Sequence, residues 1–147
     1  MANSFILNLS NQMCFAVYST AHALNRVYKP LLDPLGLTYP QYLVMLVLWE
    51  ADGLTVKQIG ERLRLDSGTL TPLLKRLQTA GLVRRERDTS DERQVRIGLT
   101  EQGQALREKA EAVPLRLIEA TGFTGEEVQV LRSVFVRLRD RLDKASG

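Results

Sequence analysis

The residue best suited to chemistry in this 147-residue sequence is its single cysteine, Cys14. Tyr18 follows four residues later and Tyr28 fourteen residues later, so the three could lie on one helix. A cysteine on an apolar helix stripe is usually inert packing, whereas a thiolate near a helix N-terminus is a nucleophile that peroxides oxidise to sulfenic acid. The helix dipole and nearby tyrosine hydroxyls would both favour the thiolate. The stretch NQMCFAVYS therefore leaves two interpretations, a redox-active thiol or a packed one.

Composition excludes several other kinds of site. One cysteine cannot form an intrachain disulfide or a cysteine-rich zinc site, and one histidine, His22, cannot form a histidine cluster. We therefore expect no metal and no cofactor, and we expect His22 to pack or to face solvent. The N-terminal stretch lacks the basic start of a signal peptide, and the apolar run YLVMLVLW is far shorter than the roughly 20 residues of a membrane span. These features predict a cytoplasmic protein that does not enter a membrane.

The net charge of +3 comes from the middle of the chain. Residues 55–100 carry 10 basic and 6 acidic side chains, whereas residues 1–54 carry 2 and 3 and residues 101–147 carry 8 of each. A local excess of positive charge is typical of a surface that binds a polyanion, although a solvated basic face has the same composition.

The elements that would position these residues follow from apolar periodicity and capping residues. A first helix is predicted from about Leu9 to Leu32, opening at Asn8 or Ser10. Thr38 then caps an apolar helix that ends before Gly53. Two short helices follow: the first is capped by Thr55, and the second is capped by Asp66 or Ser67 and stopped by Gly81. A tight RLD turn joins them.

The periodicity then changes from helical to alternating. LVRRERD and RQVRIGLT place apolar and charged residues in alternation around the polar tip TSDE, which predicts a charged two-stranded hairpin. Thr100 caps a long helix that is expected to kink or restart near Pro114, and Thr124 with Glu127 forms a capping box for a last helix. The fold class is therefore mainly α with a small β-hairpin wing, in the order α-α-α-α-β-β-α-α.

Two short capped helices followed by a basic hairpin are the plan of a winged helix-turn-helix, in which the second helix enters the DNA major groove. The small residues expected to approach base edges or phosphates are Ser67, Gly68, Thr69 and Thr71. The basic residues expected to contact phosphates are Arg64, Lys75 and Arg76. The wing offers Arg84, Arg85, Arg87, Arg93 and Arg96. Of these, Arg93 near the tip is the candidate for a narrow minor groove, and Asp91 is expected to hold its guanidinium by a bidentate pair.

These segments resemble the MarR family of winged-helix repressors. The similarity covers about residues 8–142 and includes YPQYLVMLVLWE and TVKQIGERLRLDSGTLTPLLKRLQTAGLVRRERDTSDERQVRIGLTEQG. DSGTLTPLLKRL and NQMCFAVYS are specific to the organic-hydroperoxide-sensing (OhrR) branch, whereas DER at the wing is shared by the wider family. The lone cysteine resembles the one-cysteine type of that branch.

The resemblance implies a homodimer whose N- and C-terminal helices interleave. It implies a single domain over 1–147, with dimerisation helices at about 8–37 and 101–147 and a winged helix-turn-helix at about 38–100 whose wing is 83–99. It also implies that tyrosines matching Tyr28 and Tyr39 hydrogen-bond the reactive cysteine across the dimer. This agrees with geometry, because 14 residues of straight helix place Tyr28 about 21 Å from Cys14 of its own chain.

The function that follows is repression of a pseudo-palindromic operator on double-stranded DNA, relieved by organic hydroperoxide. Oxidation of Cys14 to sulfenic acid would disturb the tyrosines and move the recognition helices off the roughly 34–36 Å spacing of successive major grooves. Because no second cysteine exists, the sulfenate must pair with a low-molecular-weight thiol, form a cyclic sulfenamide or overoxidise.

Three alternatives stay open at this stage. A MarR-type repressor could be released by a small phenolic or aromatic ligand, which would act under reducing conditions. A thiol peroxidase would use Cys14 in turnover, although the sequence lacks the βα alternation of a thioredoxin-like fold. An architectural protein would bind operator and random DNA alike, whereas a specific repressor should discriminate by roughly 10³ or more.

Overall fold

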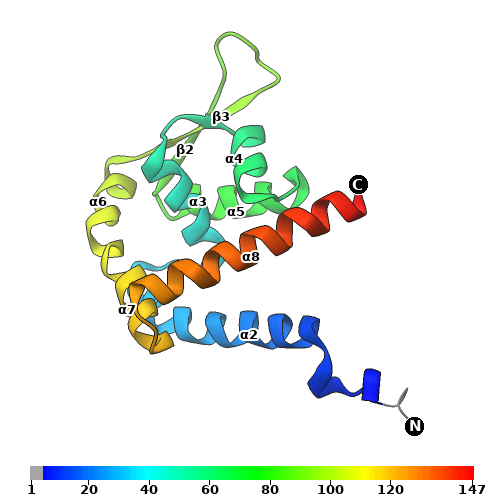
Figure 1. The fold of residues 1–147 in the computed structure, drawn as a ribbon. Helices are drawn as coiled ribbons and strands as arrows, with labels where there is room; N and C mark the ends of the chain where they lie inside the picture. Colours follow the sequence, from blue (N-terminus) through cyan, green and yellow to red (C-terminus); the bar gives the residue numbers. More distant parts are fainter. Residues whose placement is uncertain (1–4) are drawn as a thin grey trace. The chain divides into compact units, whose positions relative to one another are not determined.

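The computed structural model describes residues 5–147 and divides the chain into two compact units, with the boundary between Glu111 and Ala112 (Figure 1). The first unit contains helices, short 3-10 turns (η) and a small sheet. Its elements are η1 Leu9–Asn11, α2 Met13–Leu32, η2 Asp33–Leu35, α3 Tyr39–Glu50, β1 Leu54–Thr55, α4 Val56–Leu63, α5 Ser67–Thr79, β2 Val83–Arg87, β3 Val95–Leu99 and α6 Glu101–Ala110. The second unit consists of α7 Ala112–Thr121 and α8 Gly125–Ser146.

The first long helix begins four residues later than the sequence pattern predicts. The backbone of Gln12 is extended, and its side-chain amide donates to the carbonyl oxygens of Ile6 at 2.6 Å and Asn8 at 3.1 Å. These bonds satisfy the preceding turn rather than the helix, so η1 occupies the residues expected to be helical. As a result Cys14 is the second residue of α2 and lies in its first turn, where backbone N–H groups are unpaired within the helix.

The threonine caps predicted from the sequence are confirmed. Thr38, Thr55 and Thr124 each accept from a backbone N–H three residues on, and each takes part in a full capping box. Thr100 accepts from the N–H of Gly103 at 3.0 Å. The chain therefore fixes the start of four of its helices by local hydrogen bonds.

Helix α3 forms the centre of the first unit. Its side chains are buried on almost every side, and it packs against α2, α4, α5, α6 and β3. The core around it is completed by Ile59 of α4, by Leu70, Leu74 and Leu77 of α5, and by Val83, Ile97 and Leu99 of the sheet.

The sheet has three strands, not the two that alternation predicts. Its order is β1-β3-β2 with antiparallel neighbours, and the added strand pairs Leu54 with Ile97 and Thr55 with Arg96. A two-residue strand is too short to show a period, and Thr55 also caps α4. The predicted hairpin itself is confirmed, with Val83 opposite Leu99 and Arg87 opposite Val95.

The turn between α4 and α5 is closed by a hydrogen bond from the N–H of Leu65 to the carbonyl of Gly60 at 2.9 Å. Arg64 ends α4 in the left-handed conformation with φ 61°, which a non-glycine residue seldom adopts. The predicted interruption near Pro114 is also confirmed, because α6 ends at Ala110 and α7 starts at Ala112. Proline has no N–H to bond the carbonyl four residues before it.

Among the described residues, no single helix has the length and apolar character to cross a membrane; a bent pair, Met13–Leu35 with Tyr39–Glu50, meets those two criteria jointly.

Gly60 supports a test of the helix-turn-helix geometry. A Cβ at this position would lie 2.8 Å from the carbonyl oxygen of Leu65, which belongs to the backbone and cannot rotate away. We expect Gly60→Ala to lower the free energy of unfolding by about 1–3 kcal/mol in urea titrations.

Gly125→Ala is the matched control, because no described atom lies within 4 Å of a Cβ at that site. Its stability should equal or slightly exceed that of the wild type. Equal stability of Gly60→Ala and wild type would contradict the turn described above.

Candidate nucleic-acid interface and cysteine site

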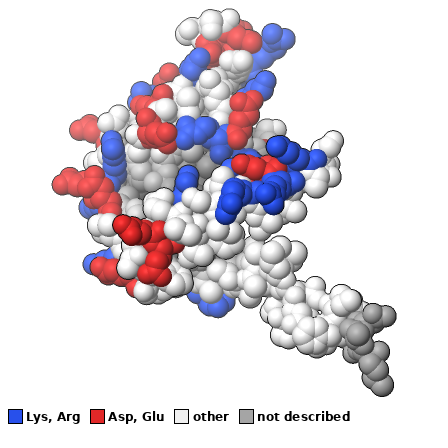
Figure 2. All heavy atoms as spheres, in the orientation of Figure 1, with Lys and Arg blue, Asp and Glu red and all other residues white. Residues whose placement is uncertain are grey.

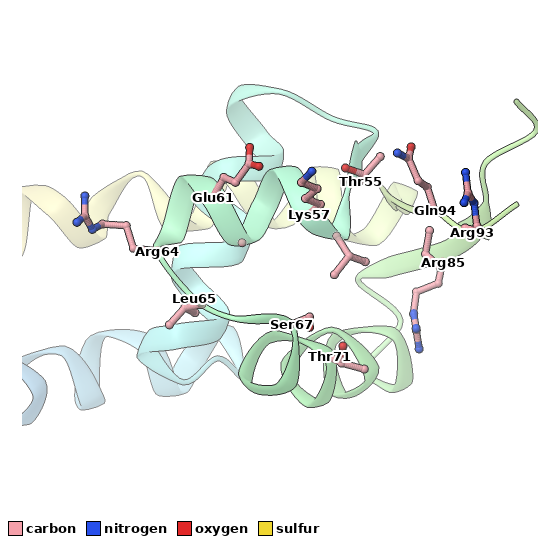
Figure 3. A pocket seen from close by; sticks show the side chains of 13 residues that line it. Thr55, Lys57, Glu61, Arg64, Leu65, Ser67, Thr71, Arg85, Arg93 and Gln94 are labelled. Atoms are coloured by element: carbon pink, nitrogen blue, oxygen red, sulfur yellow. The ribbon is translucent and has the colours of Figure 1, made fainter. Parts of the chain in front are cut away.

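A groove of about 730 Å³ lies between α4, the start of α5 and the wing (Figure 3). Arg64 stands at one end of it, and Arg85 and Arg93 project from the wing at the other. Ser67 and Thr71 of α5 lie across from α4. The structure thus brings predicted residues from the turn, the second short helix and the wing onto one concave surface.

The start of α5 is exposed and polar. Asp66 is its N-cap, and Ser67, Gly68 and Thr69 are exposed in the first turn. Thr69 Oγ1 lies 2.6 Å from Asp66 Oδ1, and this hydrogen bond holds the pKa of the Asp66 carboxyl below its usual range. Because an ionised carboxylate only accepts, the Thr69 hydroxyl must be the donor. Its lone pairs and methyl group are left for a partner.

The outer side of α5 carries the two predicted phosphate contacts. Lys75 and Arg76 are exposed, whereas Leu70, Leu74 and Leu77 on the opposite side are buried in the core. The 3.6-residue period of the helix therefore separates a packing face from a charged face.

At the wing tip, Asp91 contacts Arg93 differently from the expected bidentate pair. A single oxygen, Oδ1, accepts from Arg93 Nε at 3.2 Å and from the Arg93 backbone N–H at 3.1 Å. The Arg93 side chain is 91% exposed, so its two terminal nitrogens extend away from the wing. Positive and negative side chains alternate over this part of the surface (Figure 2).

The other wing arginines bond to the protein itself. Arg84 Nη1 donates to the Leu99 carbonyl at 3.1 Å, and Arg87 Nη1 donates to the Glu92 carbonyl at 2.9 Å across the wing loop. Arg96 Nε lies 3.1 Å from Asp88 Oδ2, and its Nη1 donates to the Gly53 carbonyl at 2.7 Å. Sequence alternation shows that a residue faces outward, but it does not show which of these groups is already occupied.

Arg85 differs from the other wing arginines. Its Nε is buried and, among the described residues, has no hydrogen-bond partner, although its side chain lines the groove beside Thr71. A buried N–H without an acceptor is unfavourable, so Arg85 carries one unsatisfied donor beneath the surface.

The cysteine stands apart from two of the predicted tyrosines, Tyr28 and Tyr39, whereas Tyr18 is one turn away on the same helix. Cys14 is a free, exposed thiol, and the ring of Tyr18 packs edge-on against His22 with centroids 4.5 Å apart. Residues 2–25 contain no Asp, Glu, Lys or Arg, and the N-terminal arm is correspondingly uncharged in Figure 2. Cys14 therefore lies in a surface without formal charge.

The tyrosines gather at the other end of α2. Tyr28 of α2 and Tyr39 of α3 have centroids 4.6 Å apart, and Tyr42 completes the cluster at 6.0 Å from Tyr28. Burial, followed by the proximity of Tyr39 and Tyr42, raises the pKa of Tyr28, so it remains a protonated donor. A hollow of about 350 Å³ borders Tyr28 and Tyr39.

Sequence analysis missed Tyr42, whose side chain is 3% exposed. Its spacing of three residues from Tyr39 places both on one helix face, which was the available signal. Residues 5–147 hold no group of three or more His, Cys, Asp or Glu side chains that could bind a metal ion.

Comparison with known proteins gives the class of this fold and site. The family model described as transcriptional regulator SarA/Rot matches residues 26–110. The organic hydroperoxide resistance transcriptional regulator of Bacillus subtilis (strain 168) is 48% identical over 97% of both chains. The regulator TtmR of Methylorubrum extorquens (strain PA1) is 54% identical over 95% of this chain and 72% of its own length.

The solved structures agree with this class. Reduced AbfR bound to DNA superposes with a TM-score of 0.82 at 38% identity over 95% of both chains, and AbfR is a protein of Staphylococcus epidermidis. AbfR has also been solved in an overoxidised form on DNA and in a disulfide form. The chain therefore belongs to the SarA/MarR family of winged-helix transcriptional regulators. Its relatives carry the names of regulators rather than enzymes, which supports a regulatory role over a catalytic one.

Asp88 allows the electrostatics of the wing to be tested by pH. Hydrogen bonds from the backbone and hydroxyl of Ser90, together with the Arg96 guanidinium, hold the pKa of Asp88 below its usual range. The folded state therefore favours the ionised carboxylate, so the stabilisation is present above the unfolded pKa of about 3.9 and is lost as pH falls through the lower folded value.

We expect Asp88→Asn to be less stable than wild type in urea titrations at pH 7, and we expect the two to converge as pH falls below about 4. A stability difference that stays constant from pH 7 to pH 3 would show that the charge of Asp88 is not what stabilises the wing.

Proposed function

We propose that this chain is a homodimeric repressor that reads a pseudo-palindromic DNA operator and releases it when an organic hydroperoxide oxidises Cys14. The observation that carries the proposal is a lone, exposed thiol in the first turn of α2 of a chain that matches a hydroperoxide resistance regulator over 97% of its length. A repressor of this kind would act on DNA in the cytoplasm.

DNA reading is supported by the first unit. The start of α5 is polar and exposed, its N-terminal backbone amides favour phosphate, and the exposed Arg93 extends from the adjoining wing. AbfR, which shares the fold at 38% identity, binds DNA in its reduced form. Phosphate contacts from Lys75 and Arg76 would set the register, and the residues at the start of α5 would read base edges.

A dimer is supported by apolar side chains that a monomer would leave in water. On α2, Phe15 is 42% exposed and Val17 39% exposed; on α8, Val134 is 43% exposed and Phe135 46% exposed. Surfaces of this kind mark interaction sites. We propose that residues 8–37 and 101–147 form the dimer interface and that 38–100, with the wing at 83–99, forms the reading unit.

A dimer would also bring Cys14 of one subunit close to the tyrosine cluster of the other, although the two are far apart within one chain. Tyr28 lies 14 residues along the same helix, about 21 Å away at 1.5 Å per residue. A second copy could bring its Cys14 to Tyr28 and Tyr39, whose raised pKa values keep their hydroxyls protonated as donors to a thiolate. The hollow beside Tyr28 and Tyr39 leaves space for an organic peroxide.

The chemistry begins with attack of the Cys14 thiolate on a peroxide oxygen. The O–O bond breaks, the thiolate becomes a sulfenic acid, and the leaving alkoxide takes a proton to become an alcohol. A low-molecular-weight thiol then displaces water from the sulfenic acid to give a mixed disulfide. AbfR binds DNA when overoxidised, which supports the bulky thiol adduct, rather than added oxygen alone, as the releasing form.

Cys14→Ser is the decisive variant. It removes the oxidisable sulfur while keeping a small polar side chain in the first turn of α2. In fluorescence anisotropy with its own upstream DNA, we expect it to bind like wild type and to remain bound when cumene hydroperoxide and a small thiol are added. Wild type should dissociate under the same conditions. Release of Cys14→Ser from DNA by peroxide would contradict the redox proposal.

A phenolic or aromatic ligand remains a second candidate inducer because of one observation. The side chains of Arg85 and Thr71 line the groove beside α5 on adjoining walls. The carboxylate of an aromatic acid in this groove would pair with the positive charge of the Arg85 guanidinium. Release of reduced wild-type protein by an aromatic acid would favour this mode, and it should also occur with Cys14→Ser.

Thr69 gives a test of base reading. Because its hydroxyl proton is committed to Asp66, its oxygen can only accept, which suits the amino groups of adenine or cytosine. We expect Thr69→Val, which keeps the shape but removes the acceptor, to lose discrimination at one base pair of each half-site, corresponding to about 1–3 kcal/mol. Selection from randomised duplexes measures this, and an unchanged consensus would contradict the assignment.

A further inference from the structure

Arg96 is the second residue of β3, where it could bond either to DNA or to the protein. It pairs with Thr55 of β1 on one side and with Glu86 of β2 on the other. Its Nε lies 3.1 Å from Asp88 Oδ2, and its Nη1 donates to the carbonyl of Gly53 at 2.7 Å. One guanidinium therefore joins the base of the wing loop to the turn that precedes α4.

Both ends of this bridge are well fixed. The Asp88 side chain is only 7% exposed, and its other oxygen accepts the backbone N–H and hydroxyl of Ser90 at 2.9 and 2.8 Å. The turn is tied to β3 a second time, because Asp52 Oδ1 accepts from the backbone N–H of Leu99 at 2.8 Å. The turn at 52–53 is therefore held against β3 at two points, and it is followed by β1 and then by α4.

Arg93 shows what an arginine available to DNA looks like on the same wing. Its side chain is 91% exposed and contacts Asp91 through Nε alone. The Arg96 side chain is 47% exposed, faces a buried carboxylate and also bonds a backbone carbonyl. The charge of Arg96 is compensated within the protein, so its attraction for a phosphate is weak in comparison.

We propose that Arg96 is a positioning residue, which fixes the wing relative to the helix-turn-helix, and that it does not contact DNA phosphate. The proposal rests on the DNA-reading function proposed above. Its consequence is geometric: the wing can place Arg93 in a minor groove only while α5 occupies the neighbouring major groove, and the Arg96 bridge holds these two parts in register.

The two roles of Arg96 predict opposite changes in DNA affinity when the charge of Asp88 is removed. If Arg96 contacted a phosphate, removing the negative charge of Asp88 would free the guanidinium and strengthen DNA binding. If Arg96 is a bridge, removing the same negative charge breaks the bridge and weakens binding. A lysine at position 96 separates the roles again, because it keeps the charge for a phosphate but cannot reproduce the two-point contact of a guanidinium.

The experiment measures affinity for a duplex that wild type selects from a random pool, and for a scrambled duplex, over a series of KCl concentrations. We expect Arg96→Gln, Arg96→Lys and Asp88→Asn each to weaken binding to the selected duplex about tenfold. The slope of log K against log salt should remain that of wild type. Arg93→Gln is the matched control, and the magnitude of its slope should fall by about 0.9, because one cation next to the DNA is lost.

Two further readouts exclude a merely structural loss. Hydroxyl-radical footprints of the bridge variants should lose protection where the wing contacts the minor groove and keep protection where α5 contacts the major groove. The double variant Asp88→Asn/Arg96→Gln should bind no more weakly than either single variant, because both changes break one bridge. Thermal melting confirms that each variant is folded, and Arg96→Lys carries the test if Arg96→Gln does not fold.

Three results would contradict the positioning role of Arg96. The first is a salt slope for Arg96→Gln that is lower than that of wild type by one contact. The others are tighter DNA binding by Asp88→Asn than by wild type, and wild-type affinity of Arg96→Lys. Failure of wild type to discriminate the selected from the scrambled duplex is a separate result, which overturns the DNA-reading function itself.

Discussion

Helix α3 has no polar face over most of its length, and this single constraint organises the first unit. A helix that is apolar on every side must be covered on every side, and α2, α4, α5, α6 and β3 supply the cover. The two ends of α3 have different roles. Tyr39 and Tyr42 at its start belong to the tyrosine cluster, whereas Trp49 near its end donates to the Gly103 carbonyl at 2.9 Å.

The same helix therefore contacts both functional regions. Glu50, its last residue, pairs with Arg62 of α4 at 2.8 Å, and the turn that follows it is tied to β3 by Asp52. We propose that a change at the tyrosines would reach the helix-turn-helix through α3, most of whose side chains are buried, because close-packed interiors transmit displacement rather than absorb it. This gives the proposed redox switch a physical route from the tyrosine cluster to α5.

Most of the fold could be predicted from the sequence because its signals are local. Threonine caps, glycine stops and the change of period at Val83 depend on neighbouring residues alone. The errors have two causes. The side chain of Gln12 bonds back to Ile6, six residues earlier, so α2 begins later than predicted. Leu54 and Thr55 form a strand only because β3, more than 40 residues later, pairs with them.

The candidate site divides in the same way. Residue type identified the basic wing, but the partners of each arginine depend on carbonyls far along the chain, such as Gly53 for Arg96 and Leu99 for Arg84. Tyr42 was missed because it lies within an apolar run, where an aromatic residue is expected to be part of the core rather than of a tyrosine cluster. The distance between Cys14 and Tyr28, by contrast, followed from helix rise alone.

Arg64 carries a consequence for the balance between stability and binding. It holds the left-handed backbone at the end of α4, where glycine would remove a cost of roughly 1–2 kcal/mol. The sequence keeps instead a long cationic side chain at the mouth of the groove. Directed evolution for thermal stability should therefore favour glycine at position 64, and such variants would lose the phosphate contact that the sequence predicts for Arg64. At this residue, backbone stability and the predicted contact with DNA favour different side chains.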